Sequence, residues 1–147
     1  MGLFVSKNNS AYIIAEVGQN HQGDYQIALD YVDKLASVGV DAVKFQMRSN
    51  KNLFSPEKLD QPYDNQNAFG TTYGEHREKL ELSFDEMSRL RDSAVRKGMD
   101  FICTPFDEVS LSKLLDLDIY SREMQEMNIG TMERIQYHHH KTVVIDT

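Results

Sequence analysis

The sequence predicts an α/β protein in which parallel strands alternate with helices. Three short apolar runs, each ending in a polar residue, carry this prediction, and they span residues 12–16, 42–46 and 100–104. Each run has the length and composition of a β-strand and is followed by a segment with helical features. Consecutive strands that are separated by a helix pair in parallel, because the helix returns the chain to the starting end of the sheet.

Four polar side chains mark the carboxyl ends of these strands. Glu16 ends the first strand, Lys44 and Gln46 lie two residues apart in the second, and Thr104 ends the third. Because alternate residues of a strand point to the same side, Lys44 and Gln46 share one face. A single polar strand end commonly just meets solvent. Three such ends in a row instead predict a site, since active sites of parallel sheets and barrels lie at the carboxyl ends of their strands.

Capping signals mark the helices between the strands. Asp24 is the expected N-cap of the first helix and Gly39 its end, while Ser83 and Glu86 form the capping box of the second. Asp107 is the expected N-cap of the third helix. The side chains expected on the buried helix faces are Ile27, Ala28, Tyr31, Val32, Leu35, Ala36, Leu82, Met87, Leu90, Ala94, Val95, Leu111, Leu114 and Leu115.

Two loops lie next to the predicted strand ends. The turn of residues 18–23 places Asn20 and His21 beside the strand that carries Glu16, and its spacing matches neither a dinucleotide fingerprint nor a phosphate loop. His21 is either a proton donor, a ligand or an ordinary loop histidine. The long segment 48–81 shows little periodicity, which predicts a functional loop or a disordered one.

Composition excludes several classes of function. The net charge of −7 and the lack of a basic patch argue against nucleic-acid binding, and no apolar stretch has membrane-spanning length. Cys103 is the only cysteine, so we expect a packed thiol in a cytoplasmic protein without internal disulfides. The adjacent histidines at 138–140 point in different directions on any regular element, so a solvated helix end is favoured over a metal site.

Several motifs of the chain, and the order in which they occur, resemble those of the sialic acid synthases, enzymes that make N-acetylneuraminate and related nonulosonic acids. The resemblance rests on segments 14–18, 20–23, 43–46, 72–77 and 104–107. It covers about residues 11–118, whereas residues 119–147 diverge. It implies a (β/α)8 barrel that condenses phosphoenolpyruvate with an N-acetylated amino sugar, such as N-acetylmannosamine, and releases phosphate with the help of manganese or another divalent cation.

The resemblance also implies a role for each candidate residue. Lys44 and Thr104 would hold the phosphate of phosphoenolpyruvate. Glu16, as the catalytic carboxylate, and Gln46 would lie against the sugar and its reacting aldehyde. Asn20 and His21 would complete the substrate-binding set.

Some parts of the family pattern are missing. A complete barrel has eight strands and typically ~250 residues, so residues 1–147 are expected to form one incomplete domain of about four to five βα units without the carboxyl-terminal half. The family's metal-binding histidines come from later strands, so the ligands of the cation are not expected in this chain. Residues 141–147 look like the fifth strand, with Asp146 where the family has a phosphate-contacting serine.

Three functional hypotheses follow. The first is a fragment of a sialic acid synthase that is inactive alone, and the second is a non-catalytic module that binds phosphate, sugar or a protein partner. The third is a different barrel enzyme that uses Lys44 as a Schiff-base amine, although Glu16 on the neighbouring strand disfavours it. In each case the open sheet edges predict self-association.

Overall fold

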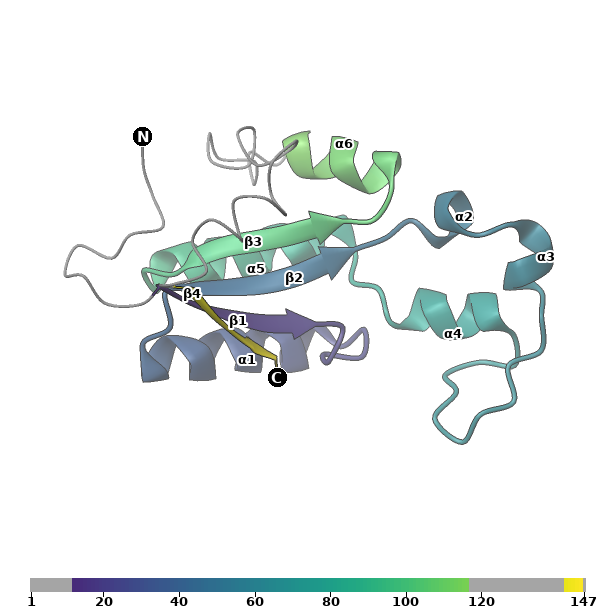
Figure 1. Cartoon of the computed structure of the whole chain (residues 1–147), viewed down its shortest axis with the longest axis horizontal. Coiled ribbons are helices and arrows are strands. Elements are labelled where there is room, and N and C mark those ends of the chain that lie inside the picture. The colour runs from purple at the N-terminus through teal and green to yellow at the C-terminus, as the bar shows by residue number, and fades with distance from the viewer. Residues whose placement is uncertain (1–11, 117–141, 147) are drawn as a thin grey trace.

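A parallel sheet of four strands forms the centre of the molecule (Figure 1). The computed structural model describes residues 12–116 and 142–146. The strands are β1 (Tyr12–Gly18), β2 (Ala42–Met47), β3 (Asp100–Pro105) and β4 (Thr142–Asp146), in the spatial order β3-β2-β1-β4. All three pairs are parallel, so the α/β prediction and the three predicted strands are confirmed.

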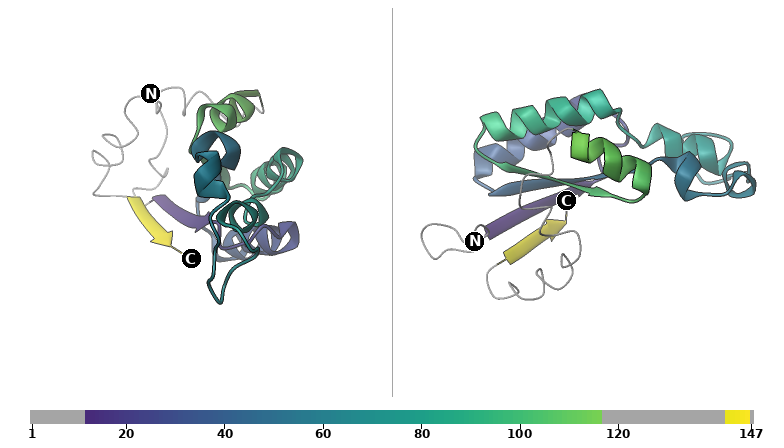
Figure 2. Two further views of the ribbon diagram at one scale, coloured as in Figure 1. Left: turned by 90° about the vertical axis from the view of Figure 1, so that its right-hand side faces the viewer. Right: turned by 90° about the horizontal axis from the view of Figure 1, so that it is seen from above.

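Helices cover one face of this sheet (Figure 2). They are α1 (Tyr25–Val38), α5 (Phe84–Arg96) and α6 (Glu108–Asp116). The main core lies between these helices and the strands and includes Val17, Val43, Phe45, Phe101 and Cys103 from the sheet and Ala28, Val32, Met87, Leu90, Ala94 and Leu114 from the helices. Strand parity determines this arrangement, because the odd-numbered residues of β2 and β3 face the helices.

The predicted capping signals are confirmed. The carboxylate of Asp24 accepts hydrogen bonds from the backbone N–H groups of Gln26 and Ile27, and Ser83 and Glu86 bond reciprocally at the start of α5. Three side chains expected on buried helix faces are exposed instead, namely Ile27, Val95 and Leu115. Each lies beside the buried stripe of its helix, where an apolar side chain can reach solvent at small cost.

The segment between β2 and α5 is more regular than the sequence predicts. It contains α2 (Asn50–Leu53), α3 (Pro56–Leu59) and α4 (Tyr73–Lys79), and an antiparallel bridge joins Pro62 to Thr72. Thr72 and Glu75 form a capping box at the start of α4. The disordered alternative is therefore wrong, since α4 is an ordered helix that lies beyond the carboxyl ends of β1 and β2, whereas a functional role of the segment stays a prediction (Figure 1).

Strand β4 lies at a different place from the one that the family resemblance implies. It pairs with β1, with Asp146 opposite Glu16 in the register, whereas a fifth barrel strand would not neighbour the first. Residues 117–141, including the histidines at 138–140, lie outside the described part of the chain. Among the helices of the described residues, none has the length and hydropathy that crossing a membrane requires.

Candidate functional site

The four polar residues predicted at the strand ends lie on one face of the sheet, the face opposite the main core. Glu16 is the register partner of Lys44, and Gln46 is the register partner of Thr104. Nearer the amino ends, the same face is apolar and carries a second cluster made of Tyr12, Ile14, Ala42 and Ile102. The strand pairing thus brings Glu16, Lys44, Gln46 and Thr104 together at the carboxyl end of the sheet.

An ion pair joins two of these residues. The Lys44 Nζ atom lies 2.6 Å from the Glu16 Oε2 atom, and the side chains are 29% and 14% exposed. An ammonium group has three donors, so Lys44 can keep this contact and still donate to another anion. A Schiff base at Lys44 would instead have to replace the ion pair, which weakens that hypothesis.

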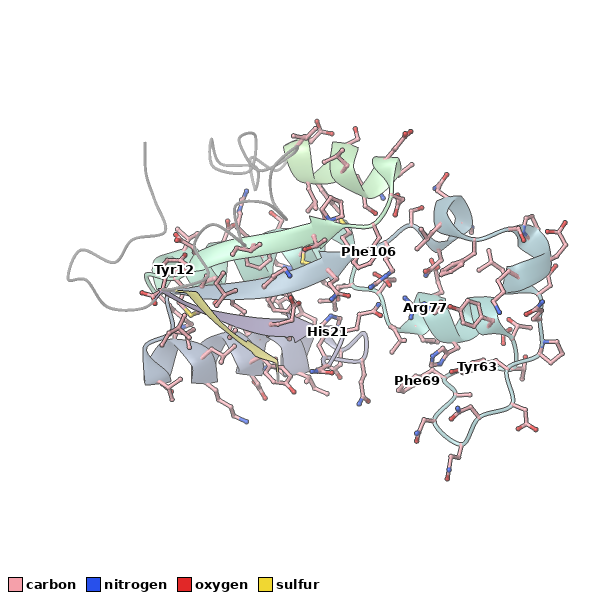
Figure 3. The ribbon with its side chains drawn as sticks, in the orientation of Figure 1. Tyr12, His21, Tyr63, Phe69, Arg77 and Phe106 are labelled. Carbon is pink, nitrogen blue, oxygen red and sulfur yellow. The ribbon has the colours of Figure 1, made fainter. Side chains whose placement is uncertain are left out.

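The structure does not bring His21 to this group. Its ring is buried on the helix-covered side of the sheet, with its centroid 6.0 Å from that of Phe45, and its Nδ1 atom accepts a hydrogen bond from the Gly23 N–H. Burial lowers the pKa of His21, and this effect is opposed by a backbone hydrogen bond with Gly18 and by the charge of Asp24. Figure 3 shows His21 on the turn that follows β1.

Asn20 lies in the same turn as His21. Its side chain is exposed, and its backbone N–H donates to the Val17 carbonyl at 3.0 Å. Asn20 therefore lies in the turn at the carboxyl end of β1, as the sequence predicts.

A charged cluster that the sequence analysis does not single out lies beside Gln46. The Arg48 Nη1 and Arg77 Nη2 atoms lie 3.8 and 3.9 Å from the Glu81 Oε1 atom, and all three side chains are mostly buried. Burial raises the pKa of Glu81, although both guanidinium groups oppose the shift. Arg48 has the same parity as Lys44 and Gln46, and this spacing of two residues is the signal that could have identified it.

Glu81 connects the loops at this end of the sheet. Its Oε1 atom accepts a hydrogen bond of 2.5 Å from the Gln19 amide, just after β1, and its Oε2 atom accepts one of 3.3 Å from the Arg48 backbone, just after β2. Arg77 approaches the same carboxylate from α4 (Figure 3). Three separate segments are thereby fixed around one carboxylate next to the polar face.

The donor atoms near the polar face do not fit a divalent cation. Within residues 12–116 and 142–146, no three histidine, cysteine, aspartate or glutamate side chains group as metal ligands would. Glu16 contacts Lys44, and His21 lies on the other side of the sheet. Cys103 is buried in the core, where burial raises the pKa of its thiol, so it packs as a small apolar side chain.

Comparison with known proteins assigns the chain to a family. The model of the NeuB family matches residues 31–145, which is most of the chain. The chain belongs to the NeuB family. Mouse N-acetylneuraminate-9-phosphate synthase is 35% identical to this NeuB-family chain over 118 residues, which are 80% of the chain and 33% of that enzyme.

Other relatives agree with this assignment. An N,N'-diacetyllegionaminic acid synthase from Legionella pneumophila is 33% identical over 129 residues, covering 87% of this chain and 36% of that enzyme. The crystal structure of a sialic acid synthetase from Leptospira borgpetersenii, in complex with citrate, has a TM-score of 0.59 and 28% identity over 76% of this chain and 35% of that one. This NeuB-family chain therefore spans about a third of the length of the relatives it matches.

Proposed function

We propose that the chain forms part of the substrate site of a sialic acid-type synthase, on a sheet that is part of a β/α barrel. The observation that carries the proposal is the convergence of Glu16, Lys44, Gln46 and Thr104 on one face at the carboxyl end of parallel strands. Family membership supports the reaction class. The substrates are phosphoenolpyruvate and an N-acetylated amino sugar.

Each residue has a role that suits its chemistry. The ammonium group of Lys44 and the hydroxyl of Thr104 bind the phosphate of phosphoenolpyruvate, because a cation and a hydrogen-bond donor offset its charge. Glu16 acts as the acid–base group for the proton that the aldehyde oxygen gains when the new carbon–carbon bond forms. Gln46 binds the amino sugar through its amide, and Asn20 contacts the substrate from the turn after β1. No step is assigned to a metal ion, because the described residues do not fit one.

Calorimetry with phosphoenolpyruvate tests the phosphate site. We expect weak binding that is abolished in Lys44→Ala and reduced in Thr104→Val. Lys97→Ala is the matched control, because Lys97 also pairs with a carboxylate, 3.2 Å from Asp33 on the helical layer, away from the polar face. Equal affinity of the wild-type, Lys44→Ala and Lys97→Ala chains would contradict the assigned role of Lys44.

We further propose that this chain alone does not turn over substrate. It spans a third of its relatives, and its described donor groups do not form a divalent cation site. Phosphate release is measured with manganese, phosphoenolpyruvate and N-acetylmannosamine or its 6-phosphate. Phosphoenolpyruvate binding without release is the expected result, whereas release that Glu16→Ala eliminates would contradict this expectation.

Self-association is the last part of the proposal. Among the four described strands, β3 and β4 each have one neighbour, and an open strand edge can pair with a second copy of the chain. We expect oligomers at micromolar concentration in light scattering. A monomer that unfolds cooperatively in calorimetry would contradict this part without affecting the phosphate site.

A further inference from the structure

Arg48 makes a short hydrogen bond to a residue of the proposed site. Its Nη2 atom donates to the Gln46 Oε1 atom at 2.5 Å. A guanidinium group has five N–H donors and no acceptor, so it can bond only the oxygen of a carboxamide. The choice between the two orientations of the Gln46 amide is therefore made by Arg48, and the amide nitrogen has to face away from the guanidinium.

The amide nitrogen of Gln46 lies close to the end of β1. A Cβ atom placed on Gly18 would lie 3.4 Å from the Gln46 Nε2 atom and 3.7 Å from the Glu16 Oε1 atom, so both side chains approach the same point at the end of β1. Glu16 contacts Lys44 on its other oxygen. The Gln46 amide nitrogen and the Glu16 Oε1 atom thus both lie near the end of β1, with the amide oxygen bonded to Arg48.

Arg48 itself is held by Phe106 and Glu81 as well as by Gln46. Its guanidinium carbon lies 3.8 Å from the centroid of the Phe106 ring, a cation–π contact, and its Nη1 atom lies 3.8 Å from Glu81. Its backbone N–H also donates to Glu81. With its side chain only 10% exposed, Arg48 has little freedom to adopt another orientation.

We propose that Arg48 is a positioning residue that fixes the Gln46 amide with its N–H donors toward the substrate. The site would then favour a substrate that presents an oxygen acceptor to Gln46, such as a hydroxyl or carbonyl oxygen of the amino sugar. This inference rests on the proposed function, because that function gives Gln46 its substrate. It adds a residue whose effect is transmitted through Gln46 without touching the ligand.

Side-chain amide resonances test the orientation without any ligand. In the full chain labelled with nitrogen-15, the Gln46 NH2 signals are assigned by their loss in Gln46→Leu. We expect Arg48→Met to shift these signals and to speed their exchange with water, while Arg48→Lys, which keeps a cationic donor, restores part of the wild-type signal. Arg89→Met is the matched control, because Arg89 stacks on Tyr25 at 4.5 Å on the helical layer.

The result that overturns the proposal is an unchanged Gln46 signal in both Arg48 variants. If Arg48→Met does not fold, an unchanged Gln46 signal in Arg48→Lys alone overturns the proposal, because a lysine cannot reproduce the fixed donor geometry of a guanidinium. Since no ligand is present, a failure of phosphoenolpyruvate or sugar to bind counts against the proposed function and leaves the orientation result intact.

A titration with N-acetylmannosamine tests the consequence for binding. We expect Arg48→Met and Gln46→Leu each to weaken binding about fivefold, the size of one hydrogen bond. The double variant is expected to bind no more weakly than Gln46→Leu, because both changes remove the same contact. Losses that multiply in the double variant would show that Arg48 acts independently of Gln46, and would overturn its positioning role.

Discussion

The two faces of β2 differ in what their side chains do. Val43 and Phe45 point toward the helices and are fully buried in the main core. Lys44 and Gln46 alternate with them along the same six residues and point to the opposite face, where they contact Glu16 and Arg48. One strand thus supplies packing on one side and polar groups on the other, and a shift of one residue in register would exchange them.

The polar face is also divided along its length. At the amino ends of the strands it is apolar, and the hydroxyl of Tyr12 donates to the carboxylate of Asp100 across the sheet. At the carboxyl ends it carries the ion pair and the amide described above. The ion pair and the amide of the proposed site thus lie at the end where loops from β1, β2 and α4 meet around Glu81.

The largest expected effect is a difference in unfolding free energy between substitutions on the two faces of β2. Phe45→Ala should lower the free energy of unfolding by about 3–5 kcal/mol, because it removes a fully buried ring that stacks on Phe101. Lys44→Ala should change it by less than ~1 kcal/mol, because its partly exposed ion pair contributes little. Urea unfolding measures both. A loss in Lys44→Ala as large as that in Phe45→Ala would show that the polar face supports the fold.

The next effect concerns the contact between the turn after β1 and the end of α4. A Cβ atom on Gly23 would lie 1.8 Å from the Lys79 carbonyl oxygen, whereas one on Gly39 would meet no atom within 4 Å, and both glycines have similar positive φ angles. Gly23→Ala should therefore destabilise the chain by roughly 1–3 kcal/mol more than Gly39→Ala. Thermal unfolding compares the two, and equal losses would mean that the turn is not packed against α4.

A smaller effect is expected at the start of α4. Thr72→Ala removes the side-chain oxygen that accepts from the Glu75 N–H, at a cost of ~1 kcal/mol. Thr71→Ala is the neighbouring control, since Thr71 bonds Glu75 without capping the helix. Hydrogen exchange of the α4 amides should accelerate only in Thr72→Ala, and an equal change in both variants would contradict the capping role.

The smallest effect is a pH dependence that His21 introduces on the helix-covered side. Burial lowers the pKa of His21 below its ordinary value of 6.5, so the folded chain binds fewer protons than the unfolded chain below this pH. Stability should therefore fall as the pH drops from about 6.5 toward the lowered pKa, despite the opposing charges of Asp24 and Glu86. His21→Gln should flatten this part of the profile, while His76→Gln should keep the contribution of His21. A wild-type stability profile that is flat below pH 6.5 would contradict the lowered pKa of His21.

Strand parity is the part of this structure that the sequence predicts best. The alternation in residues 42–46 and 100–104 fixes which side chains share a face, because the period of a strand is two. The helices α2 and α3 have four residues each, too few for helical periodicity to be recognised, but the capping box of Thr72 and Glu75 was readable in the sequence.

Contacts between segments that are far apart in the sequence were not predictable from local patterns. Glu81 reaches Arg48 across 33 residues, and no local pattern indicates that the segment after α4 comes back to the end of β2. The position of β4 beside β1 likewise depends on the order of strands in space, which periodicity does not contain. His21 was predicted at the correct turn, but the side of the sheet that it faces is set by packing on Phe45.

Mapping phosphoenolpyruvate onto the two faces tests the central claim most directly. In a titration of the nitrogen-15-labelled chain, the backbone amides of Glu16, Lys44, Gln46 and Thr104 should shift, while those of Val32 in α1 and Ala94 in α5 should stay unchanged. Lys44→Ala should remove the shifts. Shifts that centre on α1 and α5, or a pattern that survives in Lys44→Ala, would contradict the account that the carboxyl end of the polar face binds the ligand.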